Sequence, residues 1–230
     1  MQLNCDMGES YGPWQMGNDE AVMPWIDMAN IACGFHASDP DTMSRTVAMA
    51  ARANVTVGAH PGYNDKVGFG RRHIPHSPES ITHLVAYQTG ALDAICQQHG
   101  TRVKYIKPHG ALYHDMMNNH DVFEAMVVAA SQMDFKPAVM IQALGNNDKY
   151  QKTADRYSVP LIFEAYADRA YDDNGLLVPR SVAGAVYQDS ALIRQQVMGL
   201  VSGEIKTIKG AKLKLKADTV CVHGDNPESI

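Results

Sequence analysis

Apolar residues recur along the chain in two rhythms that alternate from one end to the other. Short runs of strand length are rich in apolar and β-branched residues, and longer segments between them repeat apolar residues at helical spacing. Strands that alternate with helices run parallel and are joined by right-handed crossovers. The pattern therefore predicts an α/β fold, either a β/α barrel or a doubly wound sheet, with strands at residues 2–6, 28–33, 55–60, 103–107, 138–143, 160–167 and 219–224.

The predicted helices begin and end at residues that commonly cap helices. Asp39-Pro40 and Ser77-Pro78 each place an N-cap side chain before a proline at the first helical position. Between the first two strands, turn-forming residues leave the presence of a helix open. The lysine-rich segment 206–216 is interpreted as a surface hairpin. The helices are predicted at residues 39–53, 77–100, 120–133, 146–157 and 181–203.

Composition limits the classes of protein to which the chain can belong. Its 230 residues, 45% of them hydrophobic, suffice for one sizeable core, so a single domain over residues 1–230 is predicted. A net charge of −5 gives no indication of a nucleic-acid or anionic-membrane partner. The opening MQLNCDMGES lacks the apolar core of a signal peptide, and no apolar run approaches the length of a membrane span. The four cysteines form no CxxC pair, which favours a reducing cytoplasm.

Ionisable residues stand at the carboxyl ends of six of the seven predicted strands. Parallel strands bring these ends to one face of a barrel or sheet, where ligands bind. A single histidine at a strand end is more often a structural hydrogen-bond partner, but gathering many charges on one face costs desolvation and repulsion. The pattern therefore predicts a functional site that contains Asp6, Glu9, His36, His60, Lys107, His109, Glu164, Asp168, Arg169, His223 and Asp225.

Two chemistries fit these residues. Asp6, His36 and His60 could bind a divalent metal that keeps an open position for water. Alternatively, the carboxylates and histidines act as acids and bases, while Lys107 and Arg169 hold an anionic substrate. The sequence contains no HExxH, no GxxxxGK[ST] and no GxGxxG, so it lacks nucleotide-binding loops of those types.

Three loop features have both a functional and a structural interpretation. The long segment 164–181 is either a lid over the site or a plain surface hairpin. The run Phe69-Gly70-Arg71-Arg72 carries either anion-binding or solvated arginines. Tyr63 and Tyr113 follow strand ends and either line the pocket or pack in its wall.

Six motifs in order make the chain resemble the LamB/YcsF family. They are LNCDMGE, NIACGFHASDP, GAHPGYND with GFGRR, KPHGALY, EAYADRAYDDNGLLVPRS and CVHGDNP, and together they extend from residue 2 to about residue 227. The resemblance implies a seven-stranded, TIM-like β/α barrel related to glycoside hydrolase and polysaccharide deacetylase barrels. It selects the barrel from the two folds that the pattern allows.

The resemblance also implies an activity. Characterised bacterial members of the family are the A subunit of an ATP-dependent 5-oxoprolinase, which opens the lactam of 5-oxo-L-proline to give L-glutamate. The implied partners are the B and C subunits, and ATP acts through the complex. Asp6 or Glu9 would then activate water, and His60, His109 or His223 would protonate the ring nitrogen or stabilise the oxyanion. The implied substrate-binding residues are Asn4, His36, Lys107, Glu164, Asp168, Arg169 and Asp225.

Two alternative functions remain open at this point. The first is a metal-dependent amide or carbohydrate hydrolase of deacetylase type that acts alone, which rests on the fold relationship only. The second is a non-catalytic subunit that binds a small acid. Both use the same strand ends, so the sequence alone does not separate them from the lactam-cleaving subunit.

Two features depart from the pattern of the family. Ser38 stands where many relatives have glycine, and it is expected to alter the loop that follows His36. The chain also stops five residues after Asp225, where relatives usually continue into a final helix. Without that helix an apolar barrel face would be exposed, which makes a homo-oligomer one expected outcome.

Overall fold

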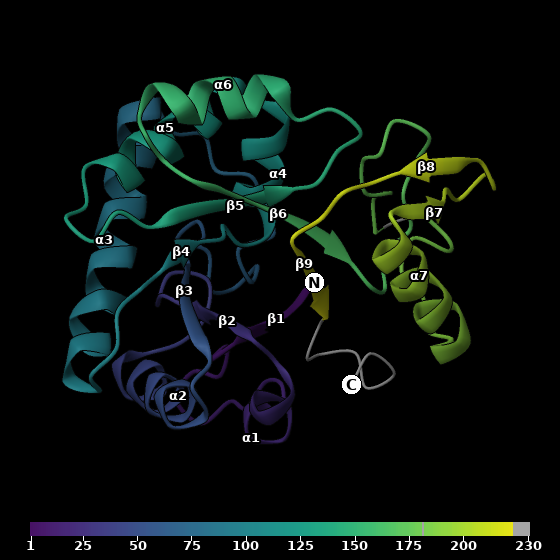
Figure 1. Cartoon of the computed structure of the whole chain (residues 1–230). Helices are drawn as coiled ribbons and strands as arrows, with labels where there is room; N and C mark the ends of the chain where they lie inside the picture. The colour runs from purple at the N-terminus through teal and green to yellow at the C-terminus, as the bar shows by residue number, and fades with distance from the viewer. Residues whose placement is uncertain (181, 223–230) are drawn as a thin grey trace.

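Seven parallel strands close into a barrel in a computed structural model that describes residues 1–180 and 182–222 (Figure 1). Each strand pairs with the next one along the chain, and the last strand pairs with both β6 and β1. This closure confirms the predicted barrel and rules out the doubly wound sheet. The strands are β1 Gln2–Met7, β2 Met28–Ala32, β3 Thr56–His60, β4 Tyr105–Ile106, β5 Ala138–Gln142, β6 Leu161–Tyr166 and β9 Thr219–Val222.

Helices cover the outside of the barrel (Figure 1). The side chains of Asp39 and Ser77 accept hydrogen bonds from the backbone N–H groups of Thr42 and Ser80, which confirms both predicted N-caps. Within residues 1–180 and 182–222, no helix is both long and apolar enough to span a membrane. The helices are α1 Asp19–Val22, the 3-10 helix η1 Met23–Trp25, α2 Pro40–Ala53, α3 Pro78–Gln98, α4 Gly110–Asn118, α5 His120–Ser131, α6 Asp148–Arg156 and α7 Ser190–Ser202.

The structure corrects the predicted helices at two places. Helix α4 was not predicted, because its nine residues are too few to show a clear period beside the KPHGALY motif. Helix α7 begins at Ser190 instead of residue 181, since the Asp189 side chain accepts from Ala191 N and caps the helix there. The predicted lysine hairpin is confirmed as the antiparallel pair β7 Glu204–Lys206 and β8 Lys212–Lys214, whose lysines are exposed.

Side chains alternate along the barrel strands between the helices and the barrel interior. Cys5 and Ile31 belong to the large apolar core, whereas the neighbouring Asn4 and Asn30 hydrogen-bond to each other, Nδ2 of Asn30 to Oδ1 of Asn4, at 2.8 Å. This alternation follows from the two-residue period of a strand. It brings polar residues from adjacent strands together inside the barrel.

Gly58 leaves room for an aromatic ring inside the barrel. It lies beside Tyr105 in the pairing of β3 with β4, and a Cβ atom at position 58 would overlap the Tyr105 ring. We expect Gly58→Ala to lower the free energy of unfolding by about 1–3 kcal/mol, as overpacking of a core does. Chemical denaturation measures the change.

Gly90 supplies a matched control for this substitution. It lies in α3, is exposed, and has no heavy atom of the described residues within 4 Å of an added Cβ. Gly90→Ala should raise the free energy of unfolding by up to about 1 kcal/mol, because alanine favours a helix over glycine. Equal effects of the two substitutions would contradict the packing of Tyr105 against Gly58.

Ser38, the departure from the family pattern, has a left-handed backbone with φ of 73° and is fully buried. Its hydroxyl lies 3.4 Å from the Asp39 carbonyl, a weak contact, while its own carbonyl accepts from Lys66 Nζ at 2.8 Å. Ser38→Gly should raise the free energy of unfolding by about 0.5–1 kcal/mol, because relief of strain exceeds the entropy cost of glycine. Ser38→Ala, which keeps the strain, should give no gain in thermal or urea unfolding.

Candidate active site

A cavity of about 680 Å³ lies at the carboxyl ends of the barrel strands, a size typical of small-molecule sites. The structure brings many of the predicted site residues to its lining and holds others buried. Those that line it are Asp6, Glu9, His60, Lys107, His109 and Arg169. Those that are almost fully buried, at 0–1% exposure, are Asn4, His36, Glu164 and Asp168. His223 and Asp225 lie outside the described residues.

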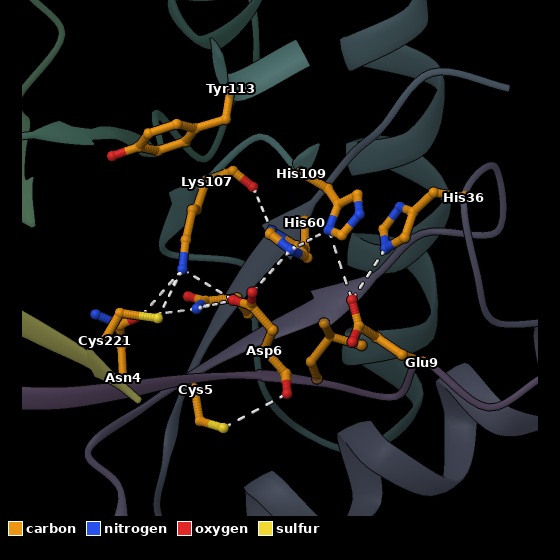
Figure 2. Close-up of polar contacts among 12 residues, drawn as sticks. Asn4, Cys5, Asp6, Glu9, His36, His60, Lys107, His109, Tyr113 and Cys221 are labelled. Carbon is orange, nitrogen blue, oxygen red and sulfur yellow. Dashed lines mark hydrogen bonds and ion pairs between the residues drawn. The ribbon is translucent and has the colours of Figure 1, made fainter. Parts of the chain in front are cut away.

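The ammonium group of Lys107 lies between two carboxylates (Figure 2). Nζ is 2.8 Å from Asp6 Oδ1 and 2.7 Å from Glu164 Oε1. The contact with Asp6 is a hydrogen bond, whereas Oε1 of Glu164 has no well-aligned hydrogen bond within the described residues and is held by charge. The Cys221 thiol at 3.2 Å and Asn4 Oδ1 at 3.3 Å complete the surroundings. Lys107 is therefore surrounded by polar groups of the chain itself.

Burial and charge act in opposite directions on Lys107. Burial favours the neutral amine, but the carboxylates of Asp6 and Glu164 more than offset this and raise the pKa of Lys107 well above its usual value. Burial raises the pKa of the adjacent Cys221 thiol, so the sulfur stays protonated. Lys107 is thus a permanent cation beneath the floor of the cavity.

Asp6 is held in place from two strands. Its Oδ1 accepts from Lys107 Nζ and from Asn30 Nδ2, both at 2.8 Å, and its Oδ2 lies 3.4 Å from His60 Nε2. Two hydrogen bonds on one oxygen fix the carboxylate plane. Its side chain is 14% exposed, enough to meet a ligand in the cavity.

Asn30 is a site residue that the sequence reasoning missed. It is fully buried; its amide donates to Asp6 and Asn4, and its Oδ1 accepts from the Tyr105 hydroxyl at 2.6 Å. A polar side chain within the apolar run MANIAC was the signal that could have revealed it. Buried polar side chains persist where hydrogen bonds satisfy them.

Three histidines and Glu9 form a compact cluster beside Asp6 (Figure 2). The rings of His36 and His109 stack at 3.8 Å, and His60 packs edge-on against both. Burial, and then the neighbouring imidazoles, lower the pKa values of His36 and His109 well below the usual range. Both rings are therefore neutral at pH 7.

The histidine cluster could hold a metal ion. Glu9, His36, His60 and His109 each offer a ligand atom, and these atoms all lie within 4.8 Å of one another. The predicted trio of Asp6, His36 and His60 shares two residues with this group. Asp6 is replaced by Glu9 and His109, because Lys107 and Asn30 hold its Oδ1.

The segment from Phe69 to Arg72 divides between two roles. Arg71 lines the cavity, whereas Arg72 pairs with the buried carboxylate of Asp65. The Phe69 carbonyl accepts from His109 Nε2 at 2.8 Å. This contact depends on close approach of two loops, since Ala111 N donates to the Gly70 carbonyl, and a Cβ on Gly110 would crowd that oxygen.

The segment 164–181 forms one wall of the cavity through its residues from Asp172 to Arg180. Asp172 accepts from Gly175 N, which confirms the predicted turn. The Arg169 guanidinium donates to the carbonyls of Val178 and Ala185, at 2.7 and 3.3 Å, and so fixes the base of the loop. The segment therefore covers one side of the site, as the lid interpretation requires.

The two tyrosines occupy different positions. Tyr113 lines the cavity and donates to Glu164 Oε2 at 3.2 Å. Tyr63 is 1% exposed and donates to Asp115 at 2.6 Å, so it packs in the wall. Among the histidines predicted to lie at the surface, His99 is half-buried and the others, His73, His76, His83, His114 and His120, are exposed.

The fold and the site define a β/α-barrel enzyme with carboxylates and imidazoles gathered at the carboxyl ends of its strands. The family model of the LamB/YcsF family matches residues 1–230. The chain belongs to this family. The resemblance carried by the six motifs is thereby confirmed.

Curated relatives are similar over nearly their whole length. A protein of Vibrio vulnificus strain YJ016, named as the A subunit of 5-oxoprolinase, is 57% identical, over 99% of this chain and 92% of its own. Another of the same name, from Pseudomonas fluorescens, is 50% identical over 99% of this chain and 92% of its own. The crystal structure of the lactam utilization protein from Thermus thermophilus superposes with a TM-score of 0.91 at 35% identity, over 99% of this chain and 92% of that one.

Proposed function

We propose that this chain is the A subunit of an ATP-dependent 5-oxoprolinase and that its barrel cavity opens the lactam of 5-oxo-L-proline to give L-glutamate. The observation that carries the proposal is the match, at 50–57% identity over more than nine-tenths of their length, to proteins named as the A subunit of 5-oxoprolinase. The name of the solved relative, a lactam utilization protein, agrees with it. A cavity of about 680 Å³ admits a five-membered lactam acid.

Asp6 is the general base that we assign to this reaction. Its Oδ1 is held by Lys107 and Asn30, while its carboxylate reaches the cavity, so it can accept a proton from a water molecule that attacks the lactam carbonyl. Lys107 then acts as a positioning residue, because Asp6 and Glu164 already contact its ammonium. This replaces the substrate-holding role suggested by its place at a strand end.

Arginines supply positive charge for the substrate carboxylate. Arg71, Arg169 and Arg180 all line the cavity, although the chain as a whole carries a net charge of −5. Guanidinium groups bind carboxylates and phosphates through paired hydrogen bonds. We assign Arg71 and Arg180 to the substrate, since Arg169 is committed to the carbonyls of the loop.

The energy for ring opening comes from partner subunits in this proposal. The sequence has neither of the phosphate-binding loops noted above, and the names of the relatives, as one lettered subunit of an oxoprolinase, imply a multi-subunit enzyme. We propose B and C subunits that use ATP to activate the lactam oxygen before water attacks. A cytoplasmic location is supported by four cysteines that are buried and unpaired.

Reconstitution tests the proposed function. The purified chain, its B and C partners and ATP are combined with 5-oxoproline, and glutamate is measured after omission of each component in turn. Glutamate should form only in the complete mixture. Glutamate formed by the chain alone would instead support the metal-dependent hydrolase, and full turnover by the partners without this chain would support a binding role.

A further inference from the structure

We propose that Glu9, His36, His60 and His109 together bind one divalent transition-metal ion of the zinc class. The ligand atoms are a Glu9 carboxylate oxygen, Nε2 of His36 and His60, and Nδ1 of His109 (Figure 2). The inference concerns binding and holds whichever reaction the cavity carries out.

The spacing of these atoms matches a coordination shell. His109 Nδ1 lies 3.0 Å from His60 Nε2 and 3.6 Å from Glu9 Oε1, and His36 Nε2 lies 3.4 Å from Glu9 Oε1. Zinc–nitrogen and zinc–oxygen bonds of about 2.0–2.1 Å in a tetrahedron separate neighbouring ligand atoms by about 3.3 Å. The measured distances lie on both sides of that value, so an ion fits among them with small shifts.

The hydrogen bonds of two rings direct lone pairs toward one another. His60 Nδ1 is 2.7 Å from the Lys107 carbonyl, and His109 Nε2 is 2.8 Å from the Phe69 carbonyl. Carbonyls only accept, so each of these nitrogens carries the proton, and the opposite nitrogen of a neutral ring is an acceptor. The two acceptors, His60 Nε2 and His109 Nδ1, face each other at 3.0 Å. A cation between them removes this repulsion.

The same carbonyls give the site an outer shell of partners. Metal-binding histidines usually donate their second nitrogen to a carbonyl or carboxylate, which fixes the ring and its tautomer. His60 and His109 both have such a partner. His36 Nδ1 is buried without a partner among the described residues, so the group at Nε2 sets its tautomer: Glu9 without an ion, the ion when bound.

An extra proton is the competing explanation for the facing nitrogens. A proton on His60 Nε2 would bridge to His109, and the charge would lie 3.4 Å from Asp6 Oδ2. Three buried imidazoles favour a cation that bonds to all of them at once over a proton shared by two. The two explanations differ in whether His60 Nε2 carries hydrogen.

The ligand set selects the kind of ion. Three imidazoles and one carboxylate suit Zn²⁺, Co²⁺, Fe²⁺ or Ni²⁺, whereas Mg²⁺ and Ca²⁺ prefer all-oxygen shells. Glu9, His60 and His109 also line the cavity, so the ion is reached from the side where a ligand binds. The buried His36 closes the opposite side.

Cobalt provides a direct test on the full chain after treatment with a chelator and dialysis. Titration with Co²⁺ should saturate at one ion per chain with visible d–d absorption, and Zn²⁺ should displace it, whereas Mg²⁺ should not. Glu9→Gln and His109→Gln should each weaken binding by about 100-fold or more, since even outer-shell changes cost about 10–100-fold. His83→Gln, on the exposed face of α3, is the matched control and should bind as the unaltered chain does.

The unaltered chain alone can overturn the inference. Absence of saturable Co²⁺ and Zn²⁺ binding would do so, as would equal affinity in His109→Gln and His83→Gln. Imidazole ¹⁵N spectra give a readout that needs no substitution: protons are expected on His60 Nδ1 and His109 Nε2. A proton on His60 Nε2 that persists with excess Zn²⁺ would show the shared proton instead of the metal.

Discussion

Lys107→Met is expected to lower the free energy of unfolding by about 3–5 kcal/mol, the cost of leaving buried charges without their partner. Methionine fills most of the same volume, so the loss reports charge and not a cavity. Asp6 and Glu164 would lose a cation that lies 2.7–2.8 Å from both. Lys107 is 2% exposed and Glu164 is fully buried, so water cannot compensate. Urea unfolding of the purified chain measures the change.

Two comparisons identify the cause of this loss. Lys212→Met removes an exposed ion pair with Glu204 at 2.8 Å and should change stability little, because solvent screens such pairs. The double variant Lys107→Met with Glu164→Gln should recover part of the loss, since it also removes a buried negative charge. If Lys107→Met were as stable as Lys212→Met, the central ion pair would not hold the barrel floor together.

Asp6→Asn is expected to reduce glutamate formation in the reconstituted complex by about 10²–10⁴-fold, the range that a general base contributes. Asparagine has the same shape. Its Oδ1 can still accept from Asn30 and Lys107, and its Nδ2 can donate to His60 Nε2. The site therefore keeps its geometry and loses only the base.

Asp121→Asn is the matched control, because Asp121 is exposed at the start of α5. It should leave both stability and turnover unchanged. Glu9→Gln tests the other carboxylate considered as the base. Full turnover of Asp6→Asn together with loss in Glu9→Gln would transfer the role of base to Glu9.

The positions of the barrel strands could be predicted because each is a short apolar run between turn signals. Lys107 and His109 were placed at a strand end for this reason, and the structure brings both to the cavity. The partners of these residues depend on how the barrel closes. The contact of Lys107 with Glu164 joins β6 to the end of β4, and β5 lies between these strands in the barrel. Local patterns carry no information on such a contact.

The histidine cluster shows a second limit of sequence reasoning. Its members His36, His60 and His109 were all candidates, but Asp6 was chosen as their carboxylate because it ends a strand. Glu9 lies beyond that strand, in a loop that returns to His36 at 3.4 Å. Asn30 was missed because an amide within an apolar strand resembles a tolerated exception until its three hydrogen bonds are known.

The central claim is that the lactam opens in the cavity of this chain while ATP is used by its partners. The most direct measurement is the ratio of glutamate to phosphate released by the complex that contains Asp6→Asn. Activation would still consume ATP, so phosphate should appear while glutamate falls far behind it, whereas the complex with Asp121→Asn should release the two in step. Glutamate that keeps pace with phosphate in the Asp6→Asn complex would place ring opening elsewhere and contradict the account.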